Sequence, residues 1–136
     1  MSFDRVIALD WSAAGRPVTG PDSIWLAEAD MCGGPPHLDN PPTRAAALER
    51  LTAAVEAALA AKERLLIAAD FAFGYPAGFA ERVTGQPHAL NVWEWLTGAI
   101  TDGPDNRSTY RAAAARLNAA FPGDGPFWGN GATQDV

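Results

Sequence analysis

The chain has 136 residues, the length of one ordinary domain, which is enough to bury a core. With 48% hydrophobic and 19% charged residues it has the composition of a globular protein, which excludes a disordered chain. The net charge of −6 weakens nucleic acid as a partner, since nonspecific affinity comes mainly from Lys and Arg, although a bound metal ion can supply positive charge locally.

The apolar stretches are short and interrupted, so we expect no transmembrane helix and no membrane partner. The apolar run in the N-terminal segment is too short for a secretory signal. Cys32 is the single cysteine, which excludes an internal disulfide. A cytoplasmic location follows by default. The oligomeric state stays open, and a homo-oligomer is compatible with the sequence.

Strands dominate the first third of the chain. Residues 6–13 form a mostly apolar stretch, which predicts a strand in the interior of a sheet. Residues 23–30 predict a second strand. The segment 31–42 is rich in Gly and Pro and reads as turns, with a short edge strand around His37 and Leu38.

A helix and a strand follow. Thr43 is a good N-cap, and apolar residues recur at helical spacing up to about Lys62. These apolar positions are Leu48, Leu51, Val55, Ala58 and Leu59. Residues 64–73, "RLLIAADFAF", predict a fully buried strand, placed after a helix as a crossover connection requires.

The last third predicts two helices and a loop-like tail after Phe121. Residues 89–100 form the first helix, and residues 106–121 form the second, with Asn106 as its N-cap. The element order predicts a single α/β domain over residues 1–136. It contains an antiparallel meander, a helical crossover to a parallel strand, and helices on the faces of this mixed sheet.

Two of the predicted strands end in an aspartate, Asp10 and Asp70. Because the crossover places the fourth strand beside the first, we expect the two carboxylates to lie close together. Such a pair repels unless it is protonated or neutralised, and Mg²⁺ or Mn²⁺ is a natural neutraliser for oxygen ligands. The alternative is that each aspartate caps a turn, since "DWS" and "DF" both begin turns.

A third metal ligand is sought on the helix after Thr43. Glu49 and Glu56 lie at the edge of its predicted apolar stripe, with Leu48 as the reference, and from there one of them could reach the edge of the sheet. The alternative for each glutamate taken alone is a solvated surface position, which is the commoner role.

The segments "VIALDWSA" and "LLIAADFAFGYP" carry a resemblance, together with the strand order and a glutamate in the first helix. The chain resembles the ribonuclease H-like fold. More narrowly, it resembles the family of predicted ribonuclease H-like nucleases known as domain of unknown function 429. The resemblance covers roughly the first two-thirds of the chain. It implies two-metal hydrolysis of phosphodiester bonds, with Asp10, Glu49 and Asp70 as catalytic metal ligands.

Such a domain usually continues into another strand and a helix that carries a further acidic ligand. No strand is predicted here beyond Phe121, so we expect a fragment of a longer protein or a shortened member. The rival hypothesis is a non-catalytic ribonuclease H-like module that binds a ligand or partner and keeps its acids for structure.

The candidate substrate-binding residues flank the aspartates or begin the last helix. Trp11, Ser12 and Phe71 follow the two strand ends; the rings there either stack on a base or sugar or, as aromatics more often do, plug the end of the sheet. Arg107 and Arg111 lie four residues apart at the start of the predicted last helix. They indicate either a phosphate site or a salt-bridged face.

Overall fold

A computed structural model describes residues 3–123 and 125–127 of the chain. These residues form two compact units. Unit 1 comprises Met1–Phe71 and Gly103–Arg107, and unit 2 comprises Ala72–Asp102 and Ser108–Val136. Each unit has a hydrophobic cluster of its own.

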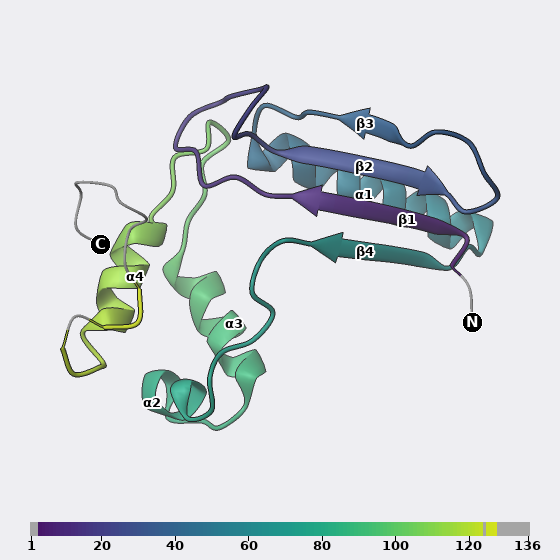
Figure 1. Ribbon diagram of the computed structural model, residues 1–136. Coiled ribbons are helices and arrows are strands. Elements are labelled where there is room, and N and C mark those ends of the chain that lie inside the picture. The colour runs from purple at the N-terminus through teal and green to yellow at the C-terminus, as the bar shows by residue number, and fades with distance from the viewer. Residues whose placement is uncertain (1–2, 124, 128–136) are drawn as a thin grey trace. The chain divides into compact units, whose positions relative to one another are not determined.

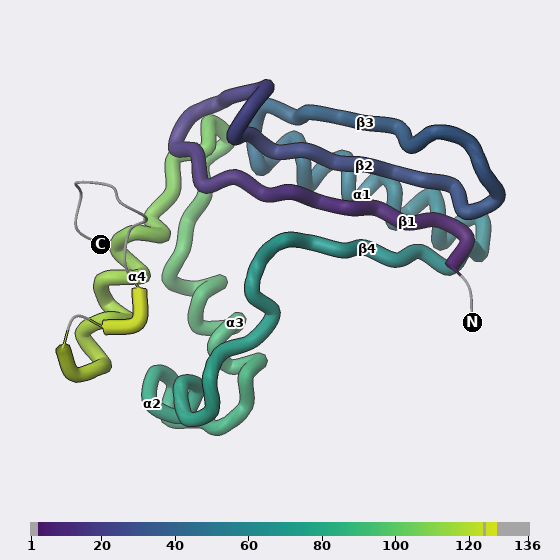
Figure 2. Tube along the Cα trace, viewed as in Figure 1, coloured from purple at the N-terminus to yellow at the C-terminus, as the bar shows by residue number. Residues whose placement is uncertain are grey.

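Unit 1 contains a four-stranded mixed sheet with the order β3-β2-β1-β4 (Figure 1). The strands are β1 (Arg5–Asp10), β2 (Trp25–Asp30), β3 (His37–Asp39) and β4 (Leu65–Ala69). β1 is antiparallel to β2 and parallel to β4, and β2 is antiparallel to β3. Helix α1 (Arg44–Ala61) carries the chain from β3 to the start of β4, as the tube in Figure 2 shows. The predicted mixed α/β sheet, with a meander followed by a helical crossover, is confirmed.

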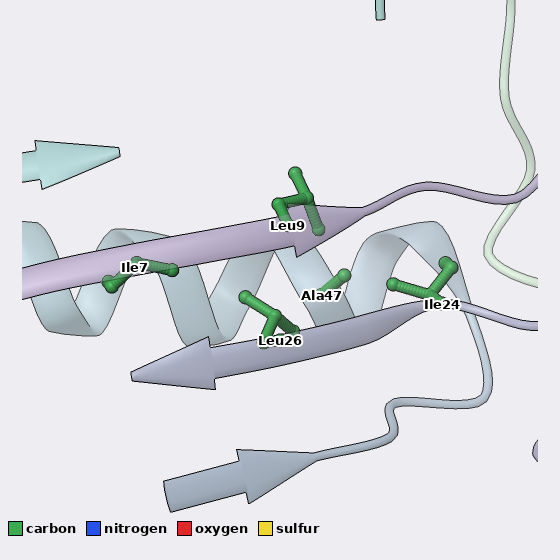
Figure 3. Packing of buried hydrophobic residues seen from close by; sticks show 5 residues of the cluster. All are labelled: Ile7, Leu9, Ile24, Leu26 and Ala47. Atoms are coloured by element: carbon green, nitrogen blue, oxygen red, sulfur yellow. The ribbon is translucent and has the colours of Figure 1, made fainter. Parts of the chain in front are cut away.

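Burial alternates along β1 and shows which face of the sheet α1 covers. Ile7 and Leu9 are buried, whereas Ala8 and Asp10 between and after them are exposed. Successive side chains of a strand point to opposite faces, so Ile7 and Leu9 belong to the α1 face. Figure 3 shows them beside Ala47 of α1. Asp10 therefore leaves the sheet on the other face.

The predicted N-cap of α1 is confirmed, and its predicted apolar stripe is right at Leu51 and Ala58 but wrong at Leu48 and Leu59. The Thr43 hydroxyl accepts a hydrogen bond from the Ala46 backbone N–H at 3.1 Å. Leu48 and Leu59 are 61% and 72% exposed. The residues that pack on the sheet follow a narrower stripe, Ala47, Leu51, Ala54 and Ala58. This stripe is mostly alanine, which lets the helix backbone approach the strands closely. Because alanine is only weakly hydrophobic, the stripe was hard to recognise from the pattern of apolar residues in the sequence.

The expectation that β4 is fully buried is wrong. Leu66 and Ile67 are 38% and 39% exposed. In the sheet order β4 has a neighbour on one side only, β1, and α1 covers a single face of the sheet within unit 1. The apolar sequence of β4 therefore does not indicate that the strand is buried on both faces.

The described part of unit 2 contains three helices, α2 (Phe79–Thr84), α3 (Ala89–Ala99) and α4 (Tyr110–Asn118). α3 matches the prediction, and α4 is shorter than predicted because it begins after Thr109. Sequence reasoning missed α2, a six-residue helix bounded by Gly78 and Gly85, both at positive φ. No helix in the described part of the chain has both the length and the apolar character needed to cross a membrane.

Asn106 is not the N-cap of α4; it is a buried link within unit 1. Its side-chain oxygen accepts from the Arg44 backbone N–H at 2.7 Å, and its amide nitrogen donates to the carbonyls of Arg16 and Pro42 at 3.1 and 3.3 Å. Asn106 is 1% exposed and adopts φ 68°, a conformation that Asn tolerates better than most residues. It therefore joins the segment Gly103–Arg107 to the start of α1.

Two substitutions of Asn106 should separate the contribution of its buried hydrogen bonds from that of its backbone conformation. Asn106→Gly removes the buried amide and should cost roughly 2 kcal/mol of unfolding free energy, because buried partners lose their hydrogen bonds. Asn106→Ala should cost about 1 kcal/mol more, since Ala is strained at positive φ. Urea denaturation followed by circular dichroism measures both, with the exposed Gln86→Ala as control. Equal stability of the wild type and Asn106→Gly would contradict the assigned role.

Candidate functional site

Backbone pairing brings Asp10 and Asp70 next to each other at the carboxyl ends of β1 and β4. Leu9 is the register partner of Ala69, and the Asp70 backbone N–H donates to the Leu9 carbonyl at 3.2 Å. That bond continues the parallel ladder by one position, which makes Asp10 and Asp70 neighbours across the strands. Paired strands are about 4.8 Å apart, so the expectation that the two aspartates meet agrees with the backbone.

The Asp70 side chain also braces the chain that leaves β1. Its Oδ1 accepts a hydrogen bond from the Trp11 backbone N–H at 2.8 Å. In a regular parallel ladder this N–H would bond to the Asp70 main-chain carbonyl, so the carboxylate replaces the next ladder bond. The capping role considered as the alternative for Asp70 is therefore present. It uses one carboxylate oxygen and leaves Oδ2 available.

Neither aspartate has a basic partner in the described part of the chain. Both residues are exposed, and among the described residues neither carboxylate forms an ion pair with Arg, Lys or His. Two adjacent carboxylates without a cation repel each other, which favours the binding of a positive ion. A cation bound at the pair would thus relieve repulsion.

Aromatic rings surround the two strand ends. Trp11 and Phe71 contact each other edge to face, with centroids 6.3 Å apart and an interplanar angle of 70°. Trp11 also packs against the core cluster of unit 1, so it takes the packing role considered for it. Trp25 was missed by sequence reasoning: it is the register partner of Asp10 on β2 and is 37% exposed on the same face. Only the strand pairing reveals that proximity.

Ser12 shapes the turn after Asp10. Its hydroxyl donates to the Asp22 carbonyl and accepts from the Ala14 backbone N–H, both at 3.2 Å. These bonds tie the turn to the loop that precedes β2. Ser12 therefore positions the backbone beside the candidate site.

Arg44 is the second residue that sequence reasoning missed. It is 7% exposed, and its guanidinium donates to the carbonyls of Ser12 and Ala14 at 3.2 and 3.1 Å and to that of Asn106. A cation in the first turn of a helix is opposed by the helix dipole, so its position there requires such acceptors. An arginine directly after the predicted N-cap was the available signal.

The structure places Glu49 and Glu56 away from the two aspartates. Both line a shallow groove on α1 together with Leu48 and Thr52. At 100° per residue they fall on the opposite side of α1 from Ala47 and the other sheet-facing residues, so neither carboxylate reaches the sheet edge. Within residues 3–123 and 125–127, no three or more His, Cys, Asp and Glu side chains are grouped to hold a metal ion.

Arg107 and Arg111 do not form the expected pair on one helix. Arg107 precedes α4, belongs to unit 1, and forms an exposed ion pair with Asp105 at 3.1 Å. Arg111 lies within α4 in unit 2, and its guanidinium carbon is 5.8 Å from the centre of the Tyr110 ring. The ion pair of Arg107 agrees with the salt-bridge alternative for that residue.

No family model matches the chain, and neither the curated proteins nor the solved structures include one that is significantly similar to it.

The structural role of Asp70 can be separated from any role of its charge. Asp70→Ala removes the acceptor for the Trp11 N–H and should lower the free energy of unfolding by about 1 kcal/mol. Asp70→Asn keeps a side-chain oxygen that can accept the same bond and should stay within about 0.5 kcal/mol of the wild type. Thermal and urea unfolding measure the difference. Equal destabilisation by both substitutions would show that the brace depends on charge.

Proposed function

We propose that unit 1 is a ribonuclease H-like domain that binds Mg²⁺ or Mn²⁺ at Asp10 and Asp70 and hydrolyses phosphodiester bonds. The observation that carries this proposal is the juxtaposition of two carboxylates, neither in an ion pair with a described residue, at the ends of adjacent parallel strands. The sheet order β3-β2-β1-β4 with a helical crossover supports it, because the resemblance to the domain of unknown function 429 family implies the same order.

The donor set fits a hydrated Mg²⁺ ion. Mg²⁺ prefers oxygen ligands, keeps several waters, and is usually held by only one or two carboxylates. Asp10 offers both oxygens and Asp70 offers Oδ2, since its Oδ1 is engaged by Trp11. The third ligand implied by the resemblance, Glu49, lies on the outer side of α1. The proposal therefore rests on the two aspartates.

Each part of the site has a separate task in the proposed reaction. A bound divalent ion supplies Lewis acidity and a more acidic water, the usual basis of metal-assisted phosphodiester hydrolysis. Asp10 and Asp70 would hold this ion at the edge of the sheet. Trp25 and Phe71 offer exposed ring surface beside them, where a base or sugar of the substrate would stack. Ser12 and Arg44 keep the turn after Asp10 in place.

A non-catalytic module is the second candidate, and the hydrogen bond from Trp11 to Asp70 favours it. That contact gives Asp70 a purely structural reason to be an acid. The absence of a three-ligand group among the described residues points the same way. In this reading the exposed rings bind a ligand or a partner protein, and no bond is broken.

Metal titration distinguishes the aspartates from the glutamates. Calorimetric titration of Mg²⁺ and Mn²⁺ into the chain should give saturable binding. Asp10→Asn and Asp70→Asn should each weaken it by about tenfold or more, because a charged ligand is lost. Glu49→Gln and Glu56→Gln are the matched controls on α1 and should leave the affinity unchanged. If the glutamate variants lost as much metal affinity as the aspartate variants, Glu49 and Glu56 would have to be counted as metal ligands.

Catalysis needs its own assay. Fluorescently labelled single-stranded DNA and RNA should be cleaved in the presence of Mg²⁺ or Mn²⁺, and EDTA should stop the reaction. Asp70→Asn, purified identically, should lose at least about 100-fold in rate while remaining folded, because the ion is no longer held. Metal binding without cleavage of either substrate would favour the non-catalytic module, and no metal binding would overturn the site itself.

A further inference from the structure

Unit 2 contains a cleft lined by aromatic rings that the proposed function does not use. Its volume is about 450 Å³, within the usual range of small-molecule sites. Its lining includes Tyr75, Phe79, Arg82, Phe121 and Phe127. All of them belong to unit 2, whereas the proposed metal site lies in unit 1.

Three of the rings form a near-parallel stack. Phe79 is the central ring and is 5% exposed. The Tyr75 ring lies 4.5 Å from it at an angle of 11°, and the Phe121 ring lies 5.3 Å away at 18°. Stacked rings of this kind hold one another in place and leave flat, weakly hydrated surface at their exposed parts. Such a surface is suited to binding a planar ligand.

The wall formed by Phe127 is held by two hydrogen bonds. Asn118 donates from its amide nitrogen to the Phe127 carbonyl at 2.8 Å and accepts from the Phe127 N–H at 2.9 Å. Gly125 has φ 79°, and a Cβ there would lie 2.5 Å from Asn118 Cγ. The turn before Phe127 therefore requires glycine, and the aromatic wall depends on specific residues.

Two polar groups lie at the cleft, a guanidinium and a phenol hydroxyl. The Arg82 guanidinium lies 5.2 Å above the Phe121 ring, and its Nε donates to the Ala120 carbonyl. Within residues 3–123 and 125–127, Arg82 forms no ion pair and the Tyr75 hydroxyl forms no hydrogen bond. Partial burial raises the pKa of Tyr75, so its hydroxyl remains a donor at neutral pH.

We propose that this cleft binds a small planar aromatic molecule that carries a carboxylate or phosphate group. The ring of the ligand would pack on the exposed parts of the Tyr75–Phe79–Phe121 stack. The anionic group would pair with Arg82, a cation that forms no ion pair with any described carboxylate, and would accept a hydrogen bond from the Tyr75 hydroxyl. Because the chain carries a net charge of −6, its overall field repels anions, and a preference for the anionic ligand must come from local groups.

The test uses two matched pairs of probes on the full chain, in buffer with EDTA so that the metal site plays no part. The pairs are indole-3-acetate against indole-3-acetamide, and adenosine monophosphate against adenosine. Amide chemical shifts in ¹H–¹⁵N correlation spectra should move around Arg82, Phe121 and Phe127. The anion of one pair should bind roughly tenfold tighter than its neutral partner, as expected for a charge-assisted hydrogen bond. The pair that responds identifies the source of the anionic group.

Variants assign the preference to Arg82. Arg82→Gln should remove the tenfold preference while leaving the neutral probe bound, and Arg82→Lys should retain part of it. Arg116→Gln is the matched control, because the Arg116 guanidinium lies 5.0 Å above Trp95 elsewhere in unit 2 and should not affect either probe. Phe121→Leu should weaken both members of the pair.

Three results would overturn the proposal. They are no saturable shift with any probe at millimolar concentration, equal affinity for the anionic and neutral members of both pairs, and a preference that survives Arg82→Gln. If Arg82→Gln does not fold, the salt dependence of the wild type decides the question. The preference for the anion should fall as NaCl rises, because the pairing at the mouth of the cleft is screened, and a salt-independent preference would exclude Arg82 as its cause.

Discussion

The parallel pairing of β1 with β4 is the contact on which the rest of unit 1 depends. Helix α1 spans 18 residues and returns the chain to the same end of the sheet at which β1 began, so the two strands run in one direction. Their carboxyl ends then meet, and Asp10 and Asp70 become neighbours although 60 positions separate them in the chain. A hairpin connection would have placed them at opposite ends of the sheet.

A buried arginine holds the turn that follows β1. Arg44 gives its guanidinium hydrogen atoms to backbone carbonyls of Ser12, Ala14 and Asn106, and Asn106 in turn holds the start of α1. A charged group at this depth is stable only while these acceptors remain in place. The position of the candidate site thus depends on Gly103–Arg107, a segment that follows α3 in the chain.

The two units offer different chemistry to a ligand. Unit 1 presents two carboxylates and the exposed ring of Trp25 on the sheet face that α1 leaves open, which suits a cation and a substrate that accompanies it. Unit 2 presents a stack of rings with one arginine that has no carboxylate partner among the described residues, which suits an aromatic anion. The proposed anion site in unit 2 thus has a local preference opposite to the net charge of the whole chain.

The strand order, the Thr43 cap and the proximity of Asp10 to Asp70 could be predicted from the sequence, because each follows from local pattern and from the geometry of a crossover. Which side of α1 faces the sheet depended on packing between elements and could not be predicted in this way. That face is mostly alanine, and alanine on both sides of α1 blurs the apolar pattern, so Glu49 and Glu56 looked closer to the sheet than they are. Pairing register, which no single segment encodes, placed Trp25 beside Asp10, and long-range hydrogen bonds made Asn106 a buried link to Arg44.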